Sequence, residues 1–284
     1  MMEATLAERL SDWGLLDEAE RFVADLHVHS VLSDGSDSAE EIMRAAANQG
    51  LTHVALTNHD TTRGLDEARA AGEASGVRVI GGIEVSAYDF IRGRKVHVLG
   101  LGLNEGSRTV ESVCAETLRL RERNSRWQLD RLIETGFAPD IERIEALAAQ
   151  STCLYKQHIM AGLTDALYGT PEYTALYRGL FKNGGICARD IAYLDARVAV
   201  QAILEDGGVP VLAHPGQLDS WDFIPELVSC GLAGIEAFHH DHNRRDEERA
   251  LACAHEYGLL ITGGSDYHGR FGGVPSVGFR RVEG

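Results

Sequence analysis

Two histidines separated by one residue mark the most informative segment of the sequence, ADLHVHSVLSDG at positions 24–35. His27 and His29 end a run that has the composition of a β-strand. Because side chains alternate in direction along a strand, both imidazoles point to the same side. Two convergent imidazoles form half of a metal site. Asp34 lies in the Ser-Asp-Gly turn that follows, and we expect this turn to fold back over the pair.

Further side chains able to bind a metal recur at or near the ends of later strand-like runs. They are His59, Glu84, His97, His214, Asp266 and His268. Barrel enzymes place their chemistry at the C-terminal ends of their strands. A lone H-x-H pair is usually structural, but so many coincidences favour a functional interpretation. The sequence therefore predicts a cluster of metal ligands at one end of a βα barrel.

Three more residues near strand ends are candidates for catalysis or for support of the ligands. His239 and His240 follow a strand-like run in FHHDH, and one of them is our candidate for the general acid, although a solvated loop fits the pattern equally well. We expect Asp60 to support the ring of His59, because metal-bound imidazoles usually require such a partner.

The ligand cluster requires strands whose ends meet. Seven apolar runs indicate strands, and most are continuous rather than alternating, as in parallel strands covered on both faces. The runs are 23–29, 53–58, 77–86, 96–101, 209–213, 234–238 and 259–263. Helical patterns lie between them, and the first begins at a capping box, Ser38 to Glu41. Alternating strands and helices predict an α/β fold with a parallel barrel or a doubly wound sheet.

This alternation stops between residues 104 and 199, where long amphipathic patterns such as 107–135 indicate helices and no convincing strand. We expect a helical insertion that packs over the barrel mouth. The barrel domain then comprises residues 1–103 and 200–284, with a helical extension at 1–21.

Charge and cysteine usage restrict the class of protein. The net charge of −16 over 284 residues excludes a general nucleic-acid binder, and no stable nucleic-acid complex is expected. A small phosphorylated substrate stays compatible, because metal ions supply local positive charge. Five scattered cysteines without a C-x-x-C pair indicate a reducing cytoplasm. The N-terminal segment has the pattern of neither a signal peptide nor a membrane anchor.

In these motifs the sequence resembles the PHP (polymerase and histidinol phosphatase) family of metal-dependent phosphoesterases. The likeness covers residues 25–103 and 209–268. It implies a distorted (β/α)7 barrel with a mainly helical insertion. It also implies a site for two or three divalent ions, of which manganese is the expected one and iron and zinc are compatible.

The resemblance assigns metal ligands residue by residue, in three sets that together occupy nine positions. The sets are His27, His29, Glu84 and Asp266; Glu84 as a bridge with His97 and His214; and Asp34, His59 and His268. Every position holds a residue able to bind a metal, so the resemblance implies an active enzyme rather than a silent metal-binding domain.

The closest layout is that of family members that act on ribose phosphates. The insertion segment TCLYKQHIMAGLTDALYG is nearer to the branch that opens 5-phosphoribosyl 1,2-cyclic phosphate and then releases inorganic phosphate. The alternative is a 3′-phosphatase for nucleoside 3′,5′-bisphosphates, or a 5′-end exonuclease on short RNA. An amidohydrolase acting on C–N bonds is a more distant alternative.

A second phosphate on such a substrate requires arginine or lysine. Arg119, Arg123 and Arg126 recur at helical spacing, so they share one helix face. That stripe fits a solvated surface as well as a binding site. Lys156, which has no other charge beside it, is the better single candidate for substrate binding.

Overall fold

The computed structural model describes residues 5–14 and 21–284. Within the predicted extension, Thr5 caps a short helix, α1 (Leu6–Asp12), by a reciprocal pair of hydrogen bonds with Glu8. The other parts of that extension, residues 1–4 and 15–20, lie outside the described residues.

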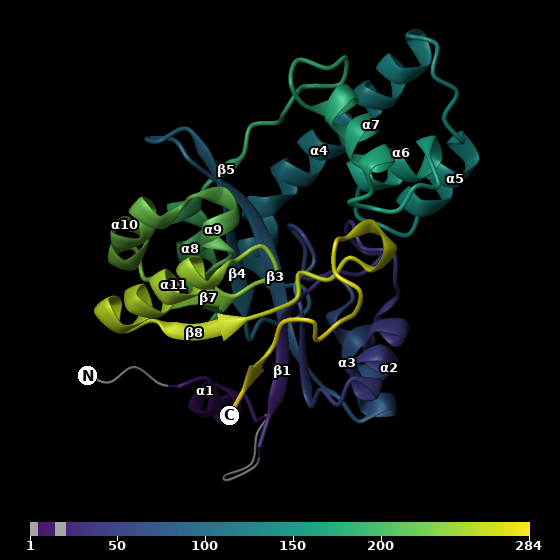
Figure 1. The fold of residues 1–284 in the computed structure, drawn as a ribbon. Coiled ribbons are helices and arrows are strands. Elements are labelled where there is room, and N and C mark those ends of the chain that lie inside the picture. The colour runs from purple at the N-terminus through teal and green to yellow at the C-terminus, as the bar shows by residue number, and fades with distance from the viewer. Residues whose placement is uncertain (1–4, 15–20) are drawn as a thin grey trace.

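A nearly closed sheet forms the centre of the molecule (Figure 1). Its main strands correspond to the seven apolar runs of the sequence. They are β1 (Val23–Val28), β2 (His53–Leu56), β3 (Arg78–Asp89), β4 (Arg94–Leu101), β6 (Val209–Leu212), β7 (Gly234–Phe238) and β8 (Leu260–Gly263). The strands follow the order β8-β7-β6-β4-β3-β2-β1, and β9 (Val282–Glu283) adds to the free edge of β1. A bridge between Val28 and Tyr267 brings the β1 and β8 sides together, which confirms the predicted distorted barrel.

One strand runs against the expected direction. β4 pairs antiparallel with both β3 and β6, and the β3–β4 hairpin extends from the pair Gly82–Leu101 to the pair Asp89–Arg94. The prediction of parallel strands is wrong here, because the connection at residues 90–93 is too short for a crossover. His97 consequently lies near the beginning of its strand and still reaches the same end of the barrel as the other predicted ligands.

Helices cover the outside of the barrel on two sides (Figure 1). On one side lie α2 (Ala39–Asn48) and α3 (Leu65–Ser75), and on the other α8 (Ala196–Glu205), α9 (Pro215–Leu218), α10 (Ile224–Ser229) and α11 (Arg244–Tyr257). The capping box at the start of α2 is confirmed, since the side chain of Ser38 accepts a hydrogen bond from the backbone N–H of Glu41. Buried aliphatic residues such as Ile42 and Ile203 face the strands.

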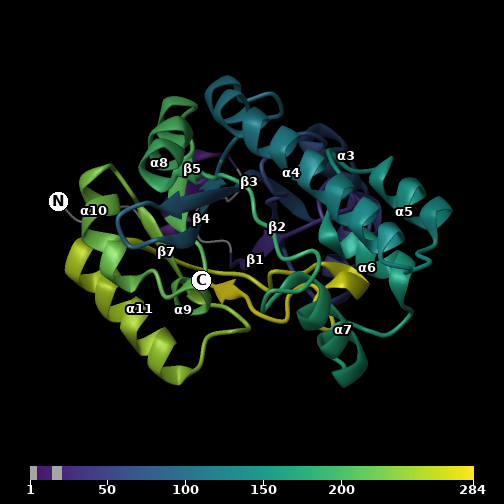
Figure 2. The same ribbon diagram turned by 90° about the horizontal axis from the view of Figure 1, so that it is seen from above.

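Four helices stand over one end of the barrel (Figures 1 and 2). They are α4 (Arg108–Glu134), α5 (Ile141–Ala148), α6 (Lys156–Leu163) and α7 (Pro171–Phe181). They share an apolar cluster of their own, which includes Leu132, Ile159 and Phe181. The prediction that residues 104–199 contain no strand is wrong at β5 (Leu194–Asp195), which pairs with β3. A strand of two residues has no periodicity, so no pattern in the sequence indicates this return to the sheet.

The opposite end of the barrel is apolar. Leu26, Leu99 and Val211 fill the interior, and Leu6 and Leu10 of α1 pack against that cluster. Most of the buried histidines lie at the end beneath α4–α7, although Asp25 and His53 are buried near the beginnings of β1 and β2. No helix in the described part of the chain is both long and apolar enough to cross a membrane.

Candidate metal centre and active site

The ligand-type residues occupy the polar end of the barrel, on or just after the strands. His27 is in β1 and His29 follows it directly, while His214 and Asp266 follow β6 and β8. Asp60, His214 and Asp266 have φ values of 60°, 25° and 51°, in the left-handed region that non-glycine residues rarely adopt. Such strain is typical of functional sites, where the surrounding structure holds a side chain in a particular direction.

The carboxylate of Glu84 lies at the centre of the cluster. Its Oε1 is 2.7 Å from His97 Nδ1 and 2.9 Å from His214 Nε2. Its Oε2 is 3.2 Å from His27 Nε2 and 3.1 Å from His29 Nε2. One buried carboxylate therefore joins imidazoles from β1 and the residue directly after it, from β4, and from the loop after β6.

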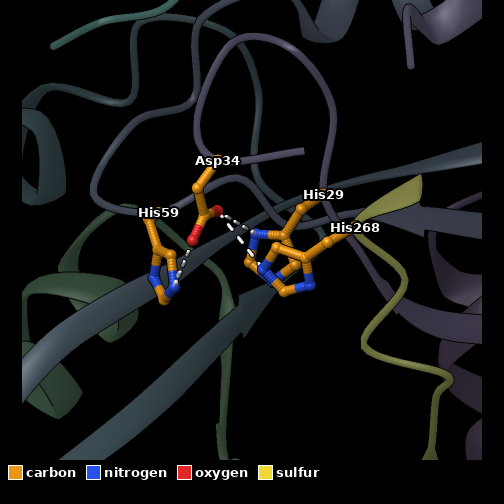
Figure 3. Close-up of side chains that lie close together, drawn as sticks. All are labelled: His29, Asp34, His59 and His268. Carbon is orange, nitrogen blue, oxygen red and sulfur yellow. Dashed lines mark ion pairs between the residues drawn. The ribbon is translucent and has the colours of Figure 1, made fainter. Parts of the chain in front are cut away.

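Asp34 organises a second group beside the first (Figure 3). Its Oδ1 is 3.3 Å from His268 Nε2 and 3.7 Å from His29 Nδ1, and its Oδ2 is 3.8 Å from His59 Nε2. The turn after β1 folds back as predicted, and it requires Gly35, because a Cβ there would lie 2.6 Å from the carbonyl oxygen of His29. His29 thus has one ring nitrogen in each group.

Asp266 adds a second carboxylate to the first group. Its Oδ1 is 3.4 Å from His27 Nε2 and 3.2 Å from His29 Nε2. Ligand atoms of His27, His29, Glu84 and Asp266 all lie within 4.8 Å of one another, and so do those of the Asp34 group. The structure therefore brings all nine predicted ligand positions into one cluster.

The donor set of this cluster fits divalent metal ions. Several ligand atoms are buried without a hydrogen-bond partner among the described residues, including His27 Nε2, His29 Nε2 and Asp34 Oδ1. Burial alone would raise the pKa of Glu84, but the neighbouring histidines, His27 first, hold that pKa well below its usual value. An ionised carboxylate among buried imidazoles is the mixture that manganese, iron or zinc binds.

Glu236 is a site residue that the sequence analysis missed. Its carboxylate lies 3.1 Å from His27 Nδ1 and accepts a hydrogen bond from the backbone N–H of His214 at 2.8 Å. It therefore directs His27 Nε2 toward Glu84 and also fixes the loop that carries His214. An acidic residue inside the buried strand run GIEAF was the available signal.

Asp60 has a different partner from the one predicted. Its Oδ1 accepts a hydrogen bond from the backbone N–H of Ser86, and its Oδ2 lies 2.8 Å from Arg121 on α4. Arg121 also donates to the hydroxyl of Ser86 at 2.8 Å, and its guanidinium lies 5.0 Å from the ring centroid of Tyr155. Both oxygens of Asp60 are thus engaged away from the ring of His59, and Arg121 is a second missed residue.

His239 and His240 lie beside the ligands but not in the wall of the cavity above them. His239 is fully buried, with Nε2 3.4 Å from Asp266 Oδ2 and Nδ1 accepting from the backbone of Asp241. Burial lowers the pKa of His239. The ring of His240 lies 3.1 Å from the carbonyl oxygen of Ser265. His239 thus contacts Asp266, and the transfer of a proton to substrate by either histidine stays a prediction.

A cavity of about 390 Å³ opens above the cluster, beneath α4–α7. Asp34, Glu84 and Asp266 are among the residues of its floor, and Lys156, the lysine predicted to bind substrate, is part of its wall. Arg119, Arg123 and Arg126 are not among the residues that line it. They lie on a face of α4 that is turned toward solvent. There Arg119 pairs with Glu116, and Arg126 pairs with Glu122 and Glu145.

Known proteins match most of this chain. The family model described as the PHP domain matches residues 25–272. A phosphoribosyl 1,2-cyclic phosphate 1,2-diphosphodiesterase from Eggerthella lenta is 60% identical over 258 residues, which cover 91% of this chain and 98% of that relative. A 3′,5′-nucleoside bisphosphate phosphatase from Chromobacterium violaceum is 29% identical, covering 89% of this chain and 90% of its own.

Solved structures agree with the sequence relatives. A protein from Bifidobacterium adolescentis, described as a metal-dependent phosphoesterase, superposes with a TM-score of 0.80 at 29% identity, covering 90% of this chain and 91% of that one. A Chromobacterium violaceum protein described as an amidohydrolase with bound sulfate has a TM-score of 0.80 at 27% identity, covering 90% of each chain.

Proposed function

The chain belongs to the PHP domain family and is a metal-dependent phosphoric ester hydrolase, and we propose that it acts on 5-phosphoribosyl 1,2-cyclic phosphate. It opens the cyclic diester and then releases inorganic phosphate. The observation that carries the proposal is the cavity itself, which has ligand-type carboxylates and imidazoles on its floor and a lysine in its wall. The name of the Eggerthella lenta relative, which this chain matches over almost its whole length, supports this choice of substrate.

We propose that the cluster holds two or three divalent ions, manganese being the expected one. The ligand sets are His27, His29, Glu84 and Asp266; Glu84 with His97 and His214; and Asp34, His59 and His268. When bound, such ions activate a water molecule for attack on phosphorus and neutralise charge on the phosphoryl oxygens.

The protein's own residues then orient and shield the reacting groups. Glu236 keeps His27 Nε2 directed at the floor of the cavity. We propose that His239 fixes Asp266 and does not act as the general acid, because its buried ring is outside the residues that line the cavity. The helices above the floor limit the access of water, which strengthens electrostatic interactions inside. We also propose that residues 104–199 act as a cap domain on the barrel.

A nucleoside bisphosphate is the second candidate substrate, and one observation favours it. Tyr168 and Tyr177 line the cavity and continue through Tyr173 into a neighbouring cavity of about 540 Å³. Ring centroids are 5.2 Å apart for Tyr168 and Tyr173 and 6.2 Å apart for Tyr173 and Tyr177. Such a row of aromatic rings suits the stacking of a base. The activity would then be that of a 3′-phosphatase, as in the Chromobacterium violaceum relative's name.

We propose that the partners are small phosphorylated molecules rather than nucleic acids, since the chain is strongly acidic. All five cysteines are free thiols, which fits the location that we propose, the reducing cytoplasm.

Phosphate release in the presence of manganese tests the substrate directly. We expect kcat/KM for 5-phosphoribosyl 1,2-cyclic phosphate to exceed that for adenosine 3′,5′-bisphosphate, with both ester bonds of the cyclic phosphate cleaved. Glu84→Gln, prepared in the same way, controls for contaminating phosphatases. A preference for the bisphosphate would establish the second candidate instead. Absence of turnover of either compound with manganese, iron and zinc would contradict both substrate proposals.

A further inference from the structure

Lysine usage in this chain is unusual and points to the cavity. The sequence contains 27 lysines and arginines, of which only Lys95, Lys156 and Lys182 are lysines. All three line the cavity above the ligand cluster. Of the 24 arginines that remain (27 − 3), Arg121 is the one that lines it. Elsewhere the chain uses arginine for its positive charges, so the placement of every lysine in one wall calls for a functional explanation.

Three separate elements bring these lysines together. Lys95 is in β4, two residues before His97, and therefore points to the same face of the strand. Lys156 is the first residue of α6, and Lys182 follows the last residue of α7. Two residues along a strand span roughly 7 Å, which is the scale of a pentose ring. A sugar that has one ester group at the ligand cluster can therefore extend to this wall.

The wall has more positive than negative charge. Among the described residues, Asp190 is the one carboxylate in the lining outside the proposed ligands. It pairs with Lys95 at 2.5 Å and accepts a hydrogen bond from Tyr193. Neither Lys156 nor Lys182 has a carboxylate partner among the described residues, although Lys182 Nζ lies 6.0 Å from the ring centroid of Tyr177. The ammonium groups of Lys156 and Lys182 are therefore available to bind an anion.

Electrostatics at Lys156 support the same conclusion. Burial lowers the pKa of Lys156 to about 8, and the charges of Lys95, Lys182 and Arg121 act in the same direction, opposed by Asp190. Like charges that destabilise one another in the free protein are stabilised when a dianion binds between them. In a chain with a net charge of −16, this cavity is a local site for anions.

We propose that Lys95, Lys156 and Lys182 form a subsite for a phosphate monoester that is not hydrolysed, the 5-phosphate of the sugar substrate. The inference rests on the proposed function, because it assumes that the reacting ester is held at the ligand cluster. Lysine is suited to this task as a compact charge with three donors, which can approach the oxygens of a dianion from several sides. The subsite makes the enzyme selective for 5-phosphorylated sugars.

Substrate pairs that differ only in the 5-phosphate test the subsite through turnover. We expect the wild type to prefer 5-phosphoribosyl 1,2-cyclic phosphate over ribose 1,2-cyclic phosphate. Lys156→Met and Lys182→Met should each reduce this ratio of kcat/KM values about ten- to hundredfold, the loss expected for one hydrogen bond to a charged group. Lys156→Arg, which keeps the charge, should restore part of the ratio.

The matched control is Arg131→Met. Arg131 carries the same charge and lies on α4, but it pairs with Glu134 at the surface, outside the lining of the cavity. This variant should leave the ratio at its wild-type value. A fall in kcat/KM by the same factor for both substrates in the lysine variants would overturn the subsite.

Chemical modification gives a readout that does not depend on turnover. With only three lysines in the chain, acetylation by acetic anhydride can be followed at each one by peptide mass spectrometry. We expect ribose 5-phosphate to protect all three lysines of the manganese-loaded enzyme, whereas ribose does not. Equal modification with and without ribose 5-phosphate would overturn the subsite.

The two measurements separate failure of the subsite from failure of the proposed function. If the cyclic ester is not hydrolysed while ribose 5-phosphate still protects the lysines, the substrate proposal fails and the subsite is supported. If the cyclic ester is hydrolysed with no loss of preference in Lys156→Met and Lys182→Met, the substrate proposal is supported and the subsite is overturned.

Discussion

Carboxylates in this protein differ in behaviour according to the cations around them. Glu84 is buried among imidazoles, and these keep its pKa low in spite of burial. Asp60 is equally buried but meets a single guanidinium, and burial raises its pKa although Arg121 opposes the change. The first is therefore an ionised carboxylate suited to a metal site, whereas the second is a structural partner of one arginine. Residue type and burial alone would not distinguish these roles.

The protonation of Lys156 predicts a pH dependence at the residue scale. Its pKa is lowered to about 8 by burial and by Lys95, Lys182 and Arg121, against the attraction of Asp190. The ammonium is charged below this pH and loses its proton as the pH rises through it. We therefore expect kcat/KM for the 5-phosphorylated substrate to fall between pH 7 and pH 9.

The comparison with Lys156→Met isolates this effect, because other titrations of the enzyme affect both proteins. The ratio of wild-type to variant kcat/KM should decrease toward one as the pH rises above about 8. A ratio that stays constant from pH 7 to pH 9 would contradict the assignment of the charge to Lys156.

At the scale of elements, the sequence predicts the positions of the strands better than their direction in the sheet. Continuous apolar runs identify the strands because parallel or antiparallel neighbours bury them equally well. The same runs contain no information on direction, so the pattern alone does not distinguish the antiparallel β4 from its parallel neighbours. The length of the connection at residues 90–93 was the informative feature, since so short a segment only permits a hairpin.

The phase of α4 explains why Arg121 lines the cavity and the predicted Arg119, Arg123 and Arg126 do not. Cys114, Thr117, Asn124 and Gln128 are buried, and Arg121 falls on the same stripe at intervals of three and four residues. Arg119 and Arg123 lie two positions to either side and face away. The arginine that shares the buried stripe of an amphipathic helix was therefore the better candidate, and the sequence contained that information.

Arg121 and Asp60 connect α4 to the barrel, and their pairing predicts a stability effect. We expect Asp60→Asn to reduce the free energy of unfolding by about 3 kcal/mol, because it leaves the guanidinium of Arg121 without its buried counter-charge. Urea unfolding of the metal-loaded protein measures the change.

The control is Asp66→Asn, whose carboxylate pairs with Arg69 at the same distance of 2.8 Å but at the surface. Asp66→Asn should reduce the free energy of unfolding by less than about 1 kcal/mol. Equal losses in the two variants would contradict a buried connection between α4 and the barrel.

The whole molecule separates its apolar and polar ends. α1 packs against the apolar interior at one end, and the buried histidines and carboxylates of the cluster are at the other end, beneath α4–α7. Sequence motifs identified this cluster because its residues stand at strand ends, which a barrel necessarily brings together. The walls of the cavity could not be derived in the same way, because Lys95, Arg121 and Tyr193 come from a hairpin, a helix and a loop whose relative placement depends on packing.

A polar end that concentrates carboxylates and imidazoles depends on cations for its stability. Divalent ions bind the folded cluster and not the dispersed ligands of the unfolded chain, so they should raise the melting temperature. At a free metal concentration of about 100 times Kd the gain is about 2.7 kcal/mol, or roughly 5 °C for a domain of this size. Manganese, iron(II) and zinc should act in this way, and calcium should act less because it prefers an all-oxygen set.

Thermal unfolding of chelator-treated protein, with each metal added back, measures this stabilisation. Glu84→Gln is the matched variant, since Glu84 contacts His27, His29 and His214 and so belongs to two of the three proposed ligand sets. We expect most of the metal-induced shift to vanish in that variant, while the melting temperature without metal changes less. A wild-type protein whose melting temperature does not respond to any of the three transition metals would contradict the metal centre. A full shift in Glu84→Gln would instead remove Glu84 from the ligand set and leave Asp34 and Asp266 as the carboxylates that hold the ions.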